Sequence, residues 1–245
     1  MRTLLAGLAL CALPSWAQAP IDLSPVPQAA SVVKLPAHWH RGAFMEIFVR
    51  AYQDSDGDGI GDLKGLISRL DYLKDLGIKG LWLMPIQANA DGDHGYATRD
   101  FRAVAPEYGT LADFDRLLAE AGKRGIGVII DYAVNHSAVQ HPAFVAARAD
   151  AMNPWRDWFV FSSEEPKGWD IWGKNPWYAN RAESWQHVGE AKDTPKAPPA
   201  SPGSRDFYFG TFGPGMPDFN LRNPAVVAYH EDSLRFWLNR GLAGY

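Results

Sequence analysis

Four aspartates alternate with glycine and other residues in one short loop. They are Asp54, Asp56, Asp58 and Asp62, and a Gly-rich turn directs such alternating carboxylates toward one point. Their mutual repulsion is relieved when a hard cation binds among the oxygens. We therefore predict a calcium site, with magnesium as the alternative metal, formed by these four carboxylates and the carbonyl oxygen of Ile60. The loop is not an EF-hand, because its closing position holds glycine instead of glutamate. The competing interpretation is a solvated acidic turn.

Two further polar groups follow apolar segments. Asp131, Asn135 and His136 come directly after an all-apolar run, and Asp93 and Tyr96 lie in the segment Asp-His-Gly-Tyr after another. In a parallel barrel, polar residues at the carboxyl ends of strands face the mouth, so both groups are expected to meet a ligand there. An aspartate beside an aromatic ring suits a hexose, because the carboxylate accepts hydroxyl hydrogens and the ring packs on the sugar's C–H face. The competing interpretations are a structural histidine and an ordinary turn.

Alternating strands and helices are expected to position these residues. A short apolar segment predicts a strand at 43–49, and apolar runs predict strands at 80–84 and 128–130. Apolar residues at helical spacing predict a helix over 63–76. Thr110 and Asp113 form a capping pair for a second helix. Asn223 and Pro224 start a third, which is expected to pack through Val226, Val227, Leu234, Trp237 and Leu238. A fourth strand is expected from Leu242. Strand, helix, strand predicts an α/β fold of parallel βα units.

The sequence divides into five predicted regions. The stretch after residue 136 is rich in Trp, Pro and Gly and is too long for an ordinary loop, so we interpret it as a small inserted domain. The regions are a signal peptide at 1–19, a linker at 20–40, a barrel portion at 41–136, the inserted domain at 137–222, and the third helix with the start of strand four at 223–245.

Taken together, these segments resemble the α-amylase superfamily, glycoside hydrolase family 13. The order of the aspartate loop, the His-Gly-Tyr segment, Asp-x-x-x-Asn-His and Met-Pro-Asp-Phe-Asn, which holds Asp218, is similar to the family's own order. The resemblance covers about residue 44 to 245 and implies the first three strands and the start of the fourth of a (β/α)8 TIM barrel. Within the family the motifs are closest to oligo-1,6-glucosidases, α-glucosidases, trehalose synthases and intermediate α-amylases.

The resemblance also implies roles by position. Tyr96 would stack on the sugar at the cleavage subsite, while Asp93 and His136 would bond that sugar. Asp131, Asn135 and Asp218 would support the site, and the aspartate loop would carry a structural calcium. The substrate would be an α-glucan or maltooligosaccharide, handled by a retaining α-glycosidase.

The resemblance places the nucleophile just after Tyr245, and the acid/base glutamate later still. Retaining glycosidases need both carboxyl groups, about 5–5.5 Å apart. The 245-residue chain is therefore expected to hold no catalytic residue, to be the front part of a longer enzyme, and to be inactive and poorly soluble alone. The alternatives are a trehalose-synthase-like isomerase or transglycosylase, and a non-catalytic sugar-binding protein.

The N-terminus predicts export. Met1 to Thr3 give a positive start, Leu4 to Leu13 an apolar run, and Ala17-Gln18-Ala19 a cleavage pattern, as in secretory signal peptides. We expect a periplasmic or extracellular protein. A net charge of −4 argues against a nucleic-acid partner, and no run beyond the signal is long enough for a membrane span.

Overall fold

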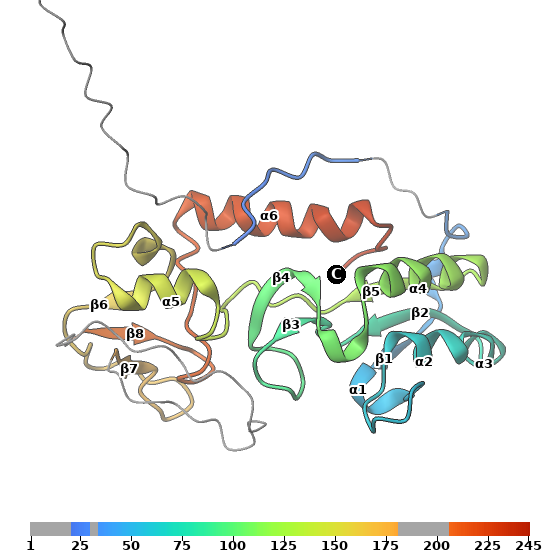
Figure 1. The fold of residues 1–245 in the computed structure, drawn as a ribbon, viewed down its shortest axis with the longest axis horizontal. Coiled ribbons are helices and arrows are strands. Elements are labelled where there is room, and N and C mark those ends of the chain that lie inside the picture. The colour runs from blue at the N-terminus through green and yellow to red at the C-terminus, as the bar shows by residue number, and fades with distance from the viewer. Residues whose placement is uncertain (1–20, 30–33, 181–205) are drawn as a thin grey trace, which may run out of the picture.

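The computed structural model describes residues 21–29, 34–180 and 206–245. Its elements form a parallel sheet with flanking helices on one side and a small antiparallel sheet with a short helix on the other (Figure 1). The first group contains η1 (Trp39–Arg41), β1 (Ala43–Ile47), α1 (Val49–Tyr52), α2 (Leu63–Ser68), α3 (Leu70–Asp75), β2 (Ile78–Leu83), β3 (Gln87–Asn89), β4 (Thr98–Val104), η2 (Pro106–Tyr108), α4 (Leu111–Lys123) and β5 (Gly127–Ile130). The second contains α5 (Pro142–Ala149), η3 (Pro154–Trp158), β6 (Phe161–Ser162), β7 (Trp177–Ala179) and β8 (Phe207–Phe209), and α6 (Pro224–Asn239) follows both.

The parallel sheet has the order β1-β2-β5. Leu81 in the central strand β2 pairs with Met45 on one side and with Val128 on the other. Gly244 forms a parallel bridge with Ile129 at the free edge of β5, where a fourth strand begins. The three predicted parallel strands and the start of a fourth are confirmed, and they form the N-terminal part of a (β/α)8 barrel.

Helix α4 begins at the predicted capping pair. The amide of Asp113 donates to the Thr110 hydroxyl at 3.2 Å, and the Thr110 amide donates back to the Asp113 carboxylate at 2.9 Å. This reciprocal pair satisfies two amides that a helix start leaves without partners. The helix then buries Phe114 and Leu117 in the main apolar core, beside the sheet.

The helix expected over 63–76 is two short helices, α2 and α3. They are separated at Arg69, whose amide donates to the carbonyl of Leu66 at 3.0 Å. This tight i to i−3 bond turns the chain, so the prediction of one continuous helix is wrong. Gly77 ends α3 in the left-handed region at φ 88°, as the sequence predicts, but Leu76 is 54% exposed and does not join the core.

A hairpin that the sequence analysis did not predict follows β2. Its strands β3 and β4 are antiparallel, with Ala88 opposite Asp100. Charged side chains at Arg99, Asp100 and Arg102 interrupt the apolar pattern of β4. The loop between the two strands carries the Asp-His-Gly-Tyr segment, so this hairpin positions part of the expected site.

The region after β5 has its own core. The strands pair in the order β6-β8-β7, and α5 and η3 pack beside them (Figure 1). Its core is mainly aromatic, and the ring of Phe144 makes edge contacts with the rings of Phe159 and Tyr208. A small inserted domain after the third barrel strand is therefore present.

Helix α6 joins the two cores. Its N-cap is Asn223, whose side chain accepts from the amide of Ala225 at 2.9 Å, as expected for Asn before Pro. Val226 near its start packs in the inserted domain's core, and Trp237 near its end packs in the barrel core. The expectation that Val227 and Leu238 also pack is wrong, because they are 40% and 39% exposed. The buried face carries these polar and aromatic residues in their place: Tyr229, His230 and Ser233.

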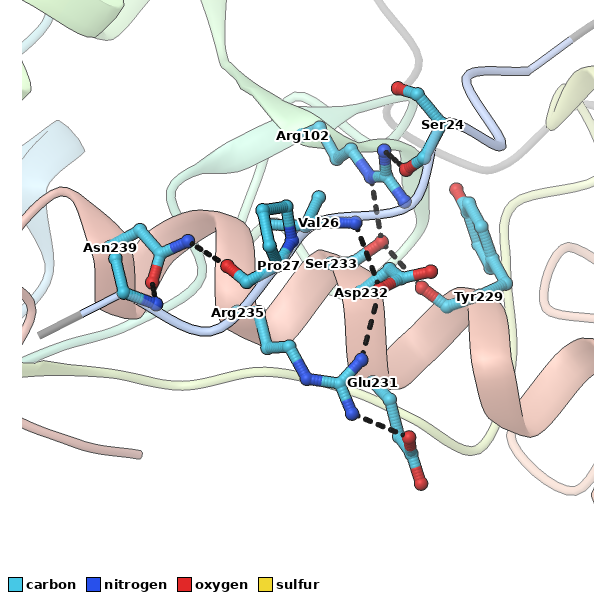
Figure 2. A network of polar contacts seen from close by, with 11 residues as sticks. Ser24, Val26, Pro27, Arg102, Tyr229, Glu231, Asp232, Ser233, Arg235 and Asn239 are labelled. Atoms are coloured by element: carbon cyan, nitrogen blue, oxygen red, sulfur yellow. Dashed lines mark hydrogen bonds and ion pairs between the residues drawn. The ribbon is translucent and has the colours of Figure 1, made fainter.

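Residues 21–29, which we call the N-terminal strap, lie along α6 (Figure 2). The amide of Val26 donates to Asp232 at 3.0 Å, and the amide of Ala29 donates to the side chain of Asn239 at 3.1 Å. Asn239 also donates to the carbonyl of Pro27 at 2.8 Å. Part of the predicted linker thus makes ordered polar contacts with a barrel helix.

Arg102 fastens the strap to the hairpin as well. Its guanidinium donates to the carbonyl of Ser24 at 3.0 Å and to the hydroxyl of Ser233 on α6 at 3.2 Å (Figure 2). It also pairs with Asp22 at 3.2 Å. Because Arg102 is 7% exposed, these contacts explain how a charge is tolerated inside β4.

The predicted signal peptide lies outside the described residues, and the five predicted boundaries stay predictions. Among the helices in the described part of the chain, none has the length and apolar character needed to span a membrane.

Candidate functional site

The expected site residues gather at the carboxyl ends of the parallel strands. Asp131 is the first residue after β5, and its amide donates to the carbonyl of Leu83 at the end of β2, at 2.8 Å. Tyr96 reaches the same place from the hairpin loop, and its hydroxyl donates to the Asp131 carboxylate at 2.8 Å. Strand ends and hairpin therefore place an aromatic ring and a carboxylate side by side.

The hydroxyl of Tyr96 stays protonated at any physiological pH. Burial, followed by its hydrogen bond to Asp131, raises the pKa of Tyr96 to about 12. The hydroxyl is therefore a donor to the carboxylate, and this bond fixes the direction of the ring.

His136 is held through both ring nitrogens. Its Nε2 lies 3.1 Å from the carbonyl oxygen of Tyr96, and its Nδ1 lies 3.4 Å from the amide nitrogen of Asn135. A carbonyl can only accept, so Nε2 carries the proton and Nδ1 accepts from Asn135. Burial lowers the pKa of His136, although Asp218 and the Tyr96 carbonyl oppose this, so the imidazole is neutral near pH 7.

Asp218 lies behind this group. Its carboxylate accepts from the amide of Thr211 at 2.9 Å and from the Thr211 hydroxyl at 2.7 Å, and its backbone bridges to His136. Burial raises the pKa of Asp218, while Thr211 and Asn135 lower it through hydrogen bonds. This residue therefore ties the end of the inserted domain to the site.

A pocket of about 550 Å³ opens over these residues. Its lining residues are Tyr96, Asp131, Ala133, Val134, Asn135, His136, Phe212 and Met216. Four of them were expected from the sequence. Phe212 was missed, although a phenylalanine between Gly210 and Gly213 is an exposed aromatic on a turn, and its ring lies 5.1 Å from that of His136.

Asp93 and Asp218 do not line the pocket in this structure. Asp93 lies on the hairpin loop with its side chain 66% exposed, and it contacts the neighbouring His94 ring at 2.7 Å. The structure therefore brings Tyr96, Asp131, Asn135 and His136 together, and it leaves Asp218 and Asp93 outside the pocket lining, with Asp93 three residues before Tyr96 on the same loop.

The aspartate loop forms a separate acidic cluster. Asp54, Asp56 and Asp58 each offer an oxygen that lies within 4.8 Å of the other two. Hydrogen bonds from the amides of Gly57 and Gly59 lower the pKa of Asp54. The donor set of convergent carboxylates fits a hard divalent cation.

Asp62 caps a helix, unlike the other three aspartates of the loop. It is the N-cap of α2 and accepts from the amide of Gly65 at 2.7 Å, while its other oxygen accepts from the amide and hydroxyl of Ser55 at 2.9 and 2.8 Å. Burial alone would raise its pKa, but these hydrogen bonds lower it overall. The structure thus leaves Asp62 outside the three-carboxylate cluster, and the amide of Ile60 donates to Asp58 at 2.7 Å.

Residues 46–245 match the family model for the α-amylase catalytic domain. The chain belongs to the α-amylase family. The family predicted from the sequence motifs is thereby confirmed, and it is a family of glycoside hydrolases.

This α-amylase-family chain is 40% identical to maltase 1 of Drosophila virilis, in a match that covers 84% of the chain and 31% of that protein. It is 34% identical to oligo-1,6-glucosidase of Parageobacillus thermoglucosidasius, covering 84% and 34%. A mutant of trehalulose synthase MutB superposes with a TM-score of 0.71 at 35% identity, covering 85% of this chain and 35% of that one. The chain thus spans about a third of the length of the relatives that it matches.

Proposed function

We propose that this chain forms one wall of the sugar site of a retaining α-glycosidase acting on α-linked glucans or maltooligosaccharides. The observation that carries the proposal is the pocket bounded by Tyr96, Asp131 and His136. A mostly apolar pocket with a few convergent polar groups is typical of ligand sites. The names of two relatives, a maltase and an oligo-1,6-glucosidase, agree with this substrate class.

In the proposed site, the ring of Tyr96 packs against the apolar face of a glucose unit. Asp131 holds the ring through its hydroxyl, and His136 fixes the backbone of the same residue. Asp93, on the same loop as Tyr96, accepts hydrogens from the sugar hydroxyls. These residues bind and orient the sugar.

Tyrosine variants of the full-length protein test this proposal. Tyr96→Ala removes the platform, and we expect kcat/KM on maltose or an aryl α-glucoside to fall at least 100-fold, since stacking and orientation are both lost. Tyr96→Phe keeps the ring, and its kcat/KM is expected to fall about tenfold. The matched control Tyr72→Phe alters a residue that is 59% exposed on α3, and it should leave kcat/KM unchanged. Normal activity of Tyr96→Ala would refute the assignment.

Bond cleavage needs carboxylates beyond this wall. Among the described residues that line the pocket, Asp131 has the one carboxylate, and it is engaged by Tyr96. A retaining mechanism needs a nucleophile and an acid/base about 5–5.5 Å apart. We therefore propose that the 245-residue chain alone does not hydrolyse glycosides. Sugar binding without cleavage by the full-length protein would favour the non-catalytic alternative.

An isomerase or transglycosylase is the second candidate. The structural similarity to trehalulose synthase MutB favours it. Product analysis separates the two: a hydrolase releases mainly glucose from maltose, whereas an isomerase converts maltose or sucrose into another disaccharide of equal mass.

We also propose that the aspartate loop holds calcium, with magnesium as the second choice. Asp54, Asp56 and Asp58 supply the carboxylates, and the Ile60 carbonyl remains a proposed ligand. When bound, the metal would neutralise the cluster and stiffen the loop. Calorimetric titration of the full-length protein should show calcium binding that Asp56→Ala and Asp58→Ala abolish, together with a lower Tm. Asp75→Ala, an exposed residue at the end of α3, is the control, and unchanged binding in both loop variants would contradict the site.

Export completes the proposal. The apolar N-terminal run and the Ala17-Gln18-Ala19 pattern support a periplasmic or extracellular location. Mass spectrometry of the protein recovered outside the cytoplasm should find a mature N-terminus after Ala19 or Ala17. An intact Met1 on the exported protein would refute cleavage.

A further inference from the structure

Three successive residues of the hairpin loop, His94, Gly95 and Tyr96, are each fixed by a different contact. Tyr96 is held by Asp131 and His136. Gly95 adopts φ 87°, and a Cβ at this position would lie 2.7 Å from the carbonyl oxygen of Pro85. The loop backbone is therefore pressed against the end of β2 just before Tyr96.

His94 is fixed from a different direction. Its ring stacks on Phe48 with the centroids 4.8 Å apart and the planes 5° from parallel. Phe48 directly follows β1, and its carbonyl accepts from the amide of Ala51 in α1 at 3.0 Å. The imidazole thus rests on a ring between β1 and α1, outside its own loop.

Asp93 depends on this imidazole. The Nδ1 of His94 lies 2.7 Å from Oδ2 of Asp93, and no other side chain among the described residues bonds this carboxylate. Because a carboxylate only accepts, Nδ1 must carry the shared proton. The contact occupies one oxygen of Asp93 and leaves the other, on a side chain that is 66% exposed, for a ligand.

We propose that His94 is a positioning residue for the sugar site: stacked on Phe48, it holds the carboxylate of Asp93 in the direction from which Asp93 meets a sugar hydroxyl. An exposed aspartate and histidine pair would contribute little without a fixed partner, and the Phe48 ring supplies that fixed surface. The proposal rests on the proposed function, since it deepens the role of Asp93 in the same site.

A double-mutant cycle in the full-length protein tests whether His94 acts through Asp93. His94→Phe keeps an aromatic ring on Phe48 and removes the donor, and we expect kcat/KM on an α-glucoside to fall about fivefold with an unchanged Tm. His94→Asn retains a donor near the position of Nδ1 and should recover most of that loss. In the Asp93→Asn background, His94→Phe should have less than a twofold further effect. Equal effects in both backgrounds would show a merely structural residue and overturn the proposal.

The control variant is His40→Phe. His40 is exposed in η1, before β1 and thus at the opposite end of that strand from Phe48, so its kcat/KM should match that of the parent protein.

A second readout does not require activity. In ¹⁵N NMR spectra, His94 should show a protonated Nδ1, and Asp93→Asn should shift the neutral ring toward the Nε2–H tautomer. If the parent protein acts on no α-glucoside, the proposed function fails while this spectrum still tests the pairing. An Nε2–H tautomer in the parent protein would refute the pairing itself.

Discussion

Replacing Arg102 with methionine tests how the N-terminal strap stabilises the fold. Arg102→Met keeps the length of the side chain and removes the two donors that reach Ser24 and Ser233 (Figure 2). The pair with Asp22 adds little, because the Asp22 side chain is 60% exposed and solvent screens it.

The magnitude follows from these contacts. Hydrogen bonds from a charged donor contribute about 1.5–3 kcal/mol each. Against this, the Nη2 of Arg102 is buried and has no hydrogen-bond partner among the described residues, so methionine relieves a desolvation penalty of about 1–3 kcal/mol. The hydroxyl of Ser233 also still donates to the carbonyl of Tyr229 at 2.8 Å. We expect a net loss of about 2 kcal/mol in the free energy of unfolding.

Urea unfolding of the mature full-length protein, followed by tryptophan fluorescence, measures this loss. The same substitution in a protein lacking residues 21–29 should cost less by at least about 1.5 kcal/mol, because the Ser24 contact is already absent. The control Arg99→Met changes a β4 residue that has no contact with the strap among the hydrogen bonds and ion pairs of the described residues, so its cost should be the same with and without residues 21–29. Additivity of Arg102→Met and the deletion within about 0.3 kcal/mol would refute the reasoning.

Three further predictions concern the cap, the buried histidines and the hairpin loop. Thr110→Ala should lower the free energy of unfolding by about 1 kcal/mol, and Thr110→Ser should not, as measured by urea unfolding. Burial lowers the pKa of His141 to about 3 and that of His230 to about 4; both lie below the ordinary value of about 6.5, so the unfolded chain binds more protons and stability falls as pH drops from about 6.5 toward 4. At pH 5 each histidine should cost roughly 2 kcal/mol, and a His230→Phe variant should show a flatter dependence of Tm on pH. Gly95→Ala should reduce kcat/KM and change Tm little, because its Cβ would displace the loop from the Pro85 carbonyl. A kcat/KM equal to that of the parent protein would contradict this.

The barrel strands were predictable because each lies in a mainly apolar segment, and the last of them, β5, reads as an unbroken apolar run. The same holds for α4 and α6, whose starts are encoded locally by Thr110 with Asp113 and by Asn223 with Pro224. At these helix starts the capping residue and the group that it bonds lie within a few residues of each other in the sequence. Local chemistry was sufficient there.

The β4 strand shows why the rest could not be predicted. Arg102 is acceptable in a buried strand only because its partners come from the strap and from α6, 78 and 131 residues away. His230 similarly belongs to the buried face of α6 because Tyr132 bonds its Nδ1 at 3.1 Å, from 98 residues away. A sequence pattern scores such positions as exposed, since it assumes that a charge or imidazole has water for a partner.

The site residues also differ in how far the sequence could predict their roles. Asp131 and Tyr96 could be assigned to one mouth because both follow strands of a parallel sheet, whose carboxyl ends share an edge. Asp62 could not be separated from its three neighbours, because alternating carboxylates look alike until a helix begins at one of them. The amide of Gly65 donates to one oxygen of Asp62 and Ser55 donates to the other, and Asp62 lies outside the group of three carboxylates whose oxygens come within 4.8 Å of one another. The proposed cation therefore has three carboxylates to rely on instead of four, and its affinity should respond to Asp56→Ala far more than to Asp62→Asn, whose main effect should be on the stability of α2.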